Sequence, residues 1–433
     1  MQLSIEKLIY GGDGLARTPA APDGRSMAVF VPFVLPGEQV ETQIRQENSG
    51  FTRASVTRIL KPSPDRVKAP CSYFEQCGGC HYQHISYERQ LEFKTQILRE
   101  TFERVGKFTL RNEIRVHGSE PWNYRNRTRL QARATGAFAL GFYRFGSHEF
   151  LAVGECPISS PLINKTIGRL SELRGLNCPA AIEELELFAD ASDEHLLGWA
   201  YCQPGANERD LLRWTEALRQ ELPELVGLQF FPSRRQLEEG APAEVKPLAQ
   251  SGAKAIRYCT AQGEYQVSAG AFFQVNRHLI NELVSVVTSA EGGTVALDLY
   301  AGVGLFSIPL AGKFHHIFAV EASHTSLQDL RQNAPASVKA VGKRTEDYLR
   351  SGAVRKRPDL VVMDPPRVGA GKAVTGSLIE LGAQRICYVS CDPATLARDL
   401  VPLLAAGYRI EEAHLFDLFP QTFHIESVML LSR

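Results

Sequence analysis

The sequence lacks any apolar run long enough to cross a membrane. The longest such run, MAVFVPFVLP from Met27, is about half of a membrane span and contains two prolines. The first residues, MQLSIEKLIYGG, lack both the apolar core and the small-residue cleavage site of a secretory signal. We therefore expect a soluble, cytoplasmic protein that does not associate with membranes.

Cysteine is scarce, and the net charge is zero. Nine cysteines in 433 residues are too few for a disulfide scaffold. An odd number in a reducing compartment favours free thiols, catalysis or metal binding. Because 48 basic residues balance 48 acidic ones, a nucleic-acid partner would have to be recognised by local charge. At this length we expect two to four domains.

The first 66 residues have the pattern of short strands separated by turns. Val29 and Val31 alternate within the apolar run, and Val40, Thr42 and Ile44 alternate again. Such strands over this length predict a small five-stranded barrel of the OB type. Residues 53–68 carry five basic residues against one acid, which fits a solvated strand and a nucleic-acid face about equally.

The stretch CSYFEQCGGCHYQH, from Cys71, contains three cysteines and two histidines in fourteen residues. Cys77 and Cys80 have the spacing of half a zinc site, which His81 or His84 could complete. The same thiols could instead hold an iron–sulfur cluster with a fourth ligand from elsewhere. The spacing alone leaves both alternatives open.

The middle region, residues 70–262, has a mixed α+β pattern. Tyr87, Leu91, Leu98 and Phe102 recur near helical spacing, which predicts an amphipathic helix over residues 87–105. This helix is a candidate to pack on the C-terminal domain.

Residues 122–148 contain five arginines and no acidic residue, with six aromatic residues interleaved. Basic side chains neutralise phosphates and aromatic rings stack on splayed bases, as recognition of single-stranded RNA requires. A strand pair with an apolar inner face would explain the aromatics equally well, but the absence of acids less well. We predict RNA contacts from Arg125, Arg127, Arg129 and Arg133.

The C-terminal region, residues 263–433, changes to a strand–loop–helix rhythm. Near-continuous apolar runs at 295–300, 317–321, 360–364 and 386–391 predict strands buried on both faces of a mostly parallel sheet. In LDLYAGVGLFSIPLA, Gly302 and Gly304 allow close backbone approach to a ligand, while Ser307 replaces the third glycine of the dinucleotide fingerprint. Glu321, 19 residues after Gly302, can bind a ribose diol. Without the Lys-Ser/Thr of a phosphate loop, an adenosyl ligand such as S-adenosylmethionine fits best.

Reactive side chains gather at the expected carboxyl edge of this sheet. Asp364 ends the third strand, and Cys391 follows the fourth, just before an Asp-Pro pair that begins a helix. A purely structural interpretation explains the Asp-Pro pair as a helix start, but it does not explain a thiol at the edge of the sheet where ligands bind. Backbone amides at a helix start favour the thiolate form of such a cysteine. His424 and Glu426 stand immediately before the last apolar strand.

Over nearly its whole length the chain resembles the bacterial RNA uracil-5-methyltransferases, in particular the iron–sulfur branch that acts on 23S ribosomal RNA. The N-terminal region ending SPDRV is similar to a TRAM domain. Two departures are Leu305, where some members have a polar cofactor contact, and Asp392, where asparagine is frequent. The other matching motifs are CSYFEQCGGCHYQHISYERQL, YRNRTRL, CPI, FFQVN, DLYAGVG, DPPR, SCDPATLARDL and FPQTFHIES.

The resemblance implies three domains: a TRAM β-barrel that binds RNA (1–66), a mixed α+β central domain with a 4Fe–4S cluster (70–262), and a Rossmann-like class I methyltransferase domain (263–433). It implies that Cys391 adds to carbon-6 of uracil and that Glu426 removes the carbon-5 proton, in a monomeric enzyme. The implied cluster ligands are Cys71, Cys77, Cys80 and Cys156. The implied cofactor contacts are Gln274, Tyr300, Gly302, Glu321, Asp364 and, as a weaker candidate, Glu346.

Three alternatives remain open at this point. The target could be 5-methyluridine in transfer RNA rather than in 23S ribosomal RNA. A methyltransferase of exocyclic amines could use the DPPR motif, but it needs an aromatic residue where Arg367 stands. A non-catalytic RNA-binding iron–sulfur protein would leave Cys391 and Glu426 without a purpose.

Overall fold

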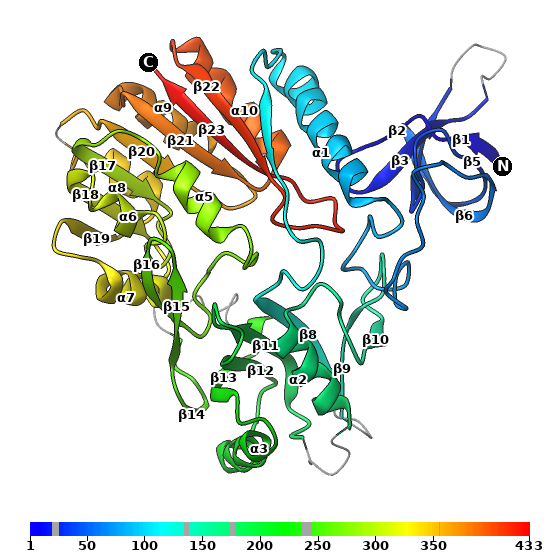
Figure 1. Ribbon diagram of the computed structural model, residues 1–433, viewed down its shortest axis with the longest axis horizontal. Helices are drawn as coiled ribbons and strands as arrows, with labels where there is room; N and C mark the ends of the chain where they lie inside the picture. The colour runs from blue at the N-terminus through cyan, green and yellow to red at the C-terminus, as the bar shows by residue number, and fades with distance from the viewer. Residues whose placement is uncertain (20–25, 134–137, 173–177, 236–244, 355) are drawn as a thin grey trace.

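The computed structural model describes residues 1–19, 26–133, 138–172, 178–235, 245–354 and 356–433. Three large sheets and one hairpin contain the strands of these residues. The N-terminal sheet, the central sheet and the C-terminal sheet occupy three corners of the molecule, and helix α1 lies between the first and the last (Figure 1).

The N-terminal sheet contains six strands in the order β1-β5-β6-β4-β3-β2. Its first segment pairs on both sides, since Gln2–Ser4 runs along β5 and Lys7–Leu8 runs along β3. Val29, Val31 and Val40 alternate inward, as the sequence predicts, and are fully buried. The strands are β1 Gln2–Ser4, β2 Lys7–Leu8, β3 Asp13–Arg17, β4 Ala28–Pro32, β5 Gln39–Glu47 and β6 Phe51–Lys61.

A long connection follows, and it returns to the C-terminal half of the protein. Helix α1 (Tyr87–Thr101) continues into a π-helical turn, η1 (Phe102–Gly106), and both pack against helix α10. Strand β7 (Ile114–His117) then pairs in parallel with β22 at the edge of the C-terminal sheet. Residues 87–117 are therefore part of the layers around that sheet.

The central sheet has the order β10-β9-β8-β11-β12-β13-β14 and carries helices α2 and α3. Its core is apolar and contains Trp214 from α3. The elements are β8 Arg127–Arg133, β9 Ala139–Tyr143, β10 Phe150–Ala152, α2 Pro161–Glu172, β11 Ile182–Ala189, β12 Leu196–Cys202, α3 Glu208–Glu221, β13 Leu225–Pro232 and β14 Ala249–Gly252.

The C-terminal sheet has the order β19-β18-β17-β20-β21-β23-β22-β7. Its first five strands are parallel, and β23 runs antiparallel between β21 and β22. The strand order reverses between β17 and β20, which is where ligands bind in open α/β sheets. The strands are β17 Gly293–Leu299, β18 Phe314–Glu321, β19 Val338–Gly342, β20 Leu360–Met363, β21 Arg385–Ser390, β22 Arg409–Phe416 and β23 Glu426–Ser432. The helices are α5 Ile280–Val287, α6 Ser307–Leu310, α7 His324–Asn333, α8 Thr345–Arg350, α9 Gly371–Leu381 and α10 Pro393–Ala405.

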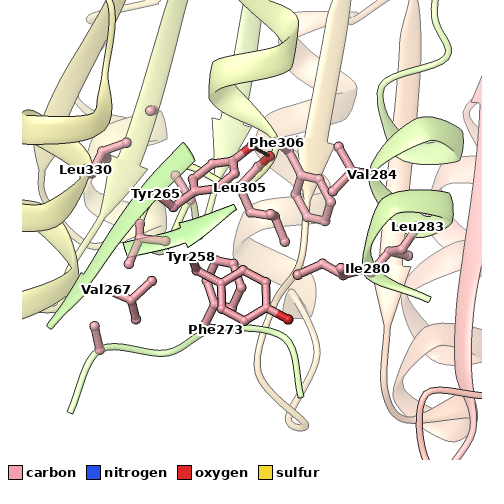
Figure 2. Packing of buried hydrophobic residues seen from close by; sticks show 14 of the residues in the cluster. Tyr258, Tyr265, Val267, Phe273, Ile280, Leu283, Val284, Leu305, Phe306 and Leu330 are labelled. Carbon is pink, nitrogen blue, oxygen red and sulfur yellow. Dashed lines mark hydrogen bonds between the residues drawn. The ribbon is translucent and has the colours of Figure 1, made fainter. Parts of the chain in front are cut away.

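A hairpin, β15 (Ala255–Thr260) and β16 (Gly263–Ser268), joins the central and C-terminal sheets. Figure 2 shows Tyr258 and Tyr265 from this hairpin packed with Phe273, Val284 of α5 and Phe306. The Tyr265 hydroxyl donates to the Leu305 carbonyl at 3.1 Å. The hairpin therefore fixes the segment after it, which enters the ligand-binding edge.

All four strands that the sequence predicts in the C-terminal region are confirmed. Their alternating side chains fill two separate apolar cores, one on each face of the sheet, as expected for strands covered on both sides. None of the helices in the described residues has the length and apolarity needed to span a membrane.

Candidate active site

A cavity of about 540 Å³ lies at the carboxyl edge of the C-terminal sheet. Its walls come from the segment after β16, from the turns after β17, β18, β20 and β21, and from the loop before β23. The lining residues are Gly270, Phe272, Gln274, Val275, Tyr300, Gly302, Glu321, Ser323, Ser326, Asp364, Pro365, Pro366, Arg367, Cys391, Phe419, His424 and Glu426. The cavity thus brings together both expected catalytic residues and five of the six expected cofactor contacts.

Cys391 and Glu426 face each other because their strands are neighbours. Strands β21 and β23 pair antiparallel, and Ser390 lies directly opposite Ser427. Cys391 is the residue after Ser390, and Glu426 is the residue before Ser427. A thiol and a buried carboxyl group therefore share one end of the cavity.

Several carboxyl groups are buried around this site. Burial raises the pKa of Asp364 to about 7, and the nearby Asp298 adds to the rise. Burial, followed by repulsion from Asp364, raises the pKa of Glu426 well above its usual value, while Arg367 opposes the rise. Burial also raises the pKa of Glu321. Because these acids repel one another, a positively charged ligand would stabilise the group as a whole.

The thiol of Cys391 is protonated in this environment. Burial raises its pKa to about 12, Glu426 and Asp364 add to the effect, and Arg367 lowers it. The helix start after it has the expected cap, since Asp392 Oδ1 accepts hydrogen bonds from the amides of Ala394 at 3.0 Å and Thr395 at 2.8 Å. Helix α10 therefore holds the residue next to the thiol rigidly.

The other end of the cavity can hold an adenosyl group. Glu321 accepts hydrogen bonds from the amides of Gly302 at 2.8 Å and Ser323 at 2.6 Å. Gly302 has φ +57°, and a side chain there would point into open space. Tyr300 also has a positive φ, of 64°, which is uncommon for a bulky residue and typical of a ligand-binding turn. Open space beside a glycine and a paired carboxylate fits a ribose and its base.

Of the expected cofactor contacts, Gln274 lines the cavity and Glu346 does not. Gln274 donates to Asp364 Oδ2 at 3.2 Å, so its amide lies between the cofactor end and the thiol end. Glu346 lies in the first turn of α8, 3.8 Å from Arg344, and does not line the cavity. Burial raises the pKa of Tyr300 to about 12, and the nearby Glu346 carboxylate adds to the rise.

A second cavity, of about 180 Å³, is lined by all four cysteines of the expected cluster site. Burial raises the pKa of the Cys71 thiol, of Cys77 to about 11 and of Cys80 to about 12, and repulsion from the nearby Cys156 adds to each. The amide of Gly79 lies 3.4 Å from the Cys77 sulfur. Cys156, from a distant part of the sequence, therefore lies beside the segment that contains Cys77 and Cys80.

Neither candidate histidine lines this cysteine cavity. The His81 ring packs on Phe423, with ring centroids 4.7 Å apart, and His84 Nε2 lies 3.4 Å from the Val34 carbonyl. Within the described part of the chain, no three His, Cys, Asp or Glu side chains are grouped as ligands of a single metal ion. The zinc alternative with a histidine ligand therefore receives no support from the geometry.

Arg125 lines the cysteine cavity instead of a free surface. Its Nε is buried and has no hydrogen-bond partner. A guanidinium in this position would balance the charge of thiolates that bind a metal cluster. Arg125 is partly buried, and the prediction that it contacts RNA stays a prediction.

Arg127 is also largely buried, with 12% of its side chain exposed, and its RNA-binding role stays a prediction. It donates to the Ala271 carbonyl at 2.7 Å and lies 3.8 Å from a Glu186 oxygen. Its guanidinium lies over the rings of Phe188 and Trp199 at 4.9 and 4.8 Å. Arg127 thus joins the central sheet to the segment that enters the active site.

Arg129 and Arg133 are exposed on strand β8. Arg129 donates to Glu186 at 3.3 Å, and the Arg133 guanidinium lies 4.7 Å from the Phe150 ring. These two arginines, on the same face of β8, remain candidates for phosphate contacts.

Two side chains near the thiol were not singled out from the sequence. Tyr10, from the N-terminal sheet, donates to the Cys391 carbonyl at 3.3 Å, and Arg367 lies 3.4 Å from His424 Nε2. Tyr10 could not be found from spacing because it comes from another sheet. Arg367 could have been found from the sequence, because it lies only three residues after Asp364 at the edge of the sheet where ligands bind.

Comparisons with known proteins find RNA methyltransferases. Residues 253–343 and 354–433 match the family model for tRNA (uracil-5-)-methyltransferase. An uncharacterized RNA methyltransferase of Aquifex aeolicus is 33% identical, with 100% of this chain and 98% of that protein covered. The 23S rRNA (uracil(1939)-C(5))-methyltransferase RlmD of Chromohalobacter salexigens is 34% identical, with 100% of this chain and 89% of that protein covered.

A solved structure shares the fold over the whole chain. The Pyrococcus abyssi tRNA (uracil-54, C5)-methyltransferase, in complex with S-adenosyl-L-homocysteine, aligns with a TM-score of 0.75. The two chains are 24% identical, and each is covered completely. The mixed α/β methyltransferase fold is therefore confirmed.

Proposed function

Because this chain belongs to the RNA uracil-5-methyltransferase family, we propose that it transfers a methyl group from S-adenosylmethionine to carbon-5 of a uridine in 23S ribosomal RNA. The observation that carries the proposal is the cavity that contains Cys391, Glu426, Asp364 and Glu321. A methyltransferase that acts on a nucleophilic amine would need neither the thiol nor the facing carboxyl group.

Cys391 is the nucleophile. Carbon-5 of uracil is a poor nucleophile, and a thiolate that adds to carbon-6 converts the ring into an enolate. Carbon-5 then takes the methyl group, and Glu426 removes the proton from carbon-5. The bond between sulfur and carbon-6 breaks, and the thiolate of Cys391 is released. The base must leave its stack to reach a thiol this deep in the protein.

Glu321 and Gly302 hold the cofactor end of the cavity, and Tyr300 forms its wall. When bound, S-adenosylmethionine supplies an electrophilic methyl group on a sulfonium cation. The repulsion between Asp364 and Glu426 favours such a cation. Gln274, hydrogen-bonded to Asp364, orients that carboxyl group between cofactor and base.

A 4Fe–4S cluster is proposed for the cysteine cavity, with Cys71, Cys77, Cys80 and Cys156 as its ligands. Four thiols around one cavity fit a multi-atom cluster, and the buried, unpartnered Nε of Arg125 provides a positive charge beside it. The cluster's role is structural, since methyl transfer needs no electron.

Residues 1–66 are proposed to form a TRAM barrel that binds RNA. The double pairing of the first segment supports a closed barrel, because β1 joins β5 while β2 joins β3. The basic edge at residues 53–68, together with Arg129 and Arg133, offers an extended surface for irregular RNA.

Trapping a covalent complex tests the function. RNA that contains 5-fluorouridine has no carbon-5 proton to remove, so the wild-type enzyme with cofactor should form a stable protein–RNA band on a denaturing gel. Cys391→Ala should form none. A wild-type protein that forms no band with 23S RNA or with transfer RNA would rule out the mechanism.

A second candidate is methylation of transfer RNA. The family model and the Pyrococcus abyssi structure both carry transfer-RNA names, which supports this alternative. The full-length relatives with ribosomal names favour the 23S target.

A further inference from the structure

The loop between β22 and β23, residues 417–425, leads directly into Glu426. Phe419 and His424 of this loop line the active-site cavity. Glu426 is the first residue of β23, so this loop adjoins the end of the strand whose pairing places Glu426 at the cavity.

The first half of the loop is anchored by groups within the C-terminal layers. Lys94 of α1 donates to Asp417 Oδ1 at 2.6 Å and to the Phe419 carbonyl at 3.1 Å. Asn276 donates to the Leu418 carbonyl at 3.2 Å. These bonds fix residues 417–419 and leave the second half to other partners.

Gln421 anchors the second half through hydrogen bonds to residues 81–90. Its carbonyl accepts from the amides of His81 at 2.8 Å and Tyr82 at 2.9 Å. Its own amide donates to Gln90 Oε1 at 3.0 Å, and its Oε1 accepts from Gln90 Nε2 at 3.0 Å. Gln421 is buried and has φ +67°, a conformation that a glutamine adopts only when its surroundings hold it there.

Gln90 joins this loop to the cysteine segment, residues 71–84. It is completely buried on α1, and its Nε2 also donates to the carbonyls of Tyr82 at 3.2 Å and Ile85 at 2.9 Å. His81, whose amide binds Gln421, is the residue after Cys80 of the cysteine cavity. The His81 ring also packs on Phe423 of the loop.

We propose that Gln90 and Gln421 are positioning residues that couple the cysteine segment to the proposed base, Glu426. Order in residues 71–84 keeps the amides of His81 and Tyr82 in place, and these amides hold Gln421 in its left-handed conformation. If that segment loosens, the Gln421 carbonyl loses both donors and the loop relaxes toward a conformation in which Glu426 is displaced. This inference takes only the role of Glu426 as the base from the proposed function.

The test compares Gln90→Leu, which removes the amide hub, with Gln96→Leu as a matched control. Gln96 lies on the same helix, is exposed, and donates to Glu100 on the helix surface. Gln421→Gly is a second variant that keeps the left-handed backbone and removes the side-chain bond. Each is assayed for adduct formation with 5-fluorouridine RNA, which does not require Glu426, and for turnover on uridine RNA, which does.

We expect Gln90→Leu to lower turnover more than tenfold while the fluorouridine adduct forms at least half as fast as in wild type. Gln421→Gly should show the same split to a smaller extent, and Gln96→Leu should match wild type in both assays. Equal loss of both activities in Gln90→Leu and Gln421→Gly, or unchanged turnover in Gln90→Leu, would overturn the coupling. A wild-type protein without any adduct would instead remove the proposed function.

Hydrogen exchange provides a readout independent of activity. Cys77→Ala should accelerate exchange of the backbone amides at 421–425, whereas Cys259→Ala, at an exposed thiol, should leave them unchanged. Faster exchange in residues 71–84 of Cys77→Ala with no change at 421–425 would show that the two segments are not coupled.

Discussion

Ser390 and Ser427 are opposite partners in the antiparallel pair β21–β23, and this pairing places Cys391 and Glu426 face to face. Cys391, the proposed nucleophile, follows the end of a parallel strand, and Glu426 begins an antiparallel strand. The proposed catalytic pair therefore forms because β23 runs antiparallel to its neighbour β21.

Glu426→Gln should separate methyl transfer from product release. The amide cannot accept the carbon-5 proton, so Cys391 should still attack and methylate the base and then remain bound to it. We expect a methylated covalent complex with uridine RNA, observed by mass spectrometry, and turnover reduced by about 10²–10⁴-fold, the usual contribution of a general base. Normal turnover in this variant would assign the proton abstraction to another group.

Alkylation of Cys391 in the free enzyme should depend steeply on pH. Burial raises the pKa of this thiol to about 12, so the thiolate is the minor form throughout pH 7–10. Its population, and hence the rate of reaction with iodoacetamide, should rise about tenfold for each pH unit. The rate is measured by mass spectrometry of the peptide that contains Cys391.

Arg367→Met should slow this alkylation at every pH in that range, because Arg367 lowers the pKa of the thiol. Arg385→Met, at the opposite end of β21, provides a control with the same loss of charge. A rate that does not change between pH 7 and 10 would mean that the thiolate is already stabilised in the free enzyme.

The sequence predicted the C-terminal strands well because a strand buried on both faces leaves an unbroken apolar run. It also predicted both ends of the active-site cavity, because the side chains of consecutive parallel strands meet at one edge. Gln90 and Lys94 could not be foreseen. Polar residues on an amphipathic helix normally face solvent, whereas each of these two has a hydrogen-bond partner on residues 417–421, more than three hundred positions away.

The arginines illustrate the same limit. A run of alternating arginines predicts a basic face, but Arg127 meets Glu186 and two aromatic rings that other segments contribute. Arg125 and Arg127 are partly buried by groups that other segments contribute, so local charge alone could not distinguish them from the exposed Arg133.

Cys156→Ala should lose the proposed cluster as completely as Cys77→Ala. Each removes one of four ligands around the same cavity, and neither leaves a histidine nearby to replace it. Protein purified without oxygen should contain about four iron and four sulfide per chain, and both variants should contain little of either. Stoichiometric zinc without iron in the wild-type protein would overturn the cluster assignment.

Arg133→Ala and Arg127→Met should have opposite consequences. Arg133 is exposed, so its loss should weaken RNA binding and reduce the slope of log affinity against log salt by about 0.7, the value for one phosphate contact on a single strand. Arg127→Met should lower the melting temperature and leave that slope unchanged, because the side chain is internal. Filter binding at several salt concentrations and thermal melts distinguish the two effects.

Deleting the gene should remove 5-methyluridine from 23S ribosomal RNA and leave transfer RNA unchanged. The chain has no net charge, so affinity should come from a shaped surface, which we propose includes residues 53–68 and β8, rather than from general attraction to polyanions. A target held on such a surface must be irregular RNA from which one uridine can leave its stack. Mapping 5-methyluridine in both RNA classes from the deletion strain measures this directly, and complementation with Cys391→Ala is the control that must fail to restore the mark. Loss of the mark from transfer RNA alone would assign the enzyme to the transfer-RNA branch and leave its chemistry as proposed.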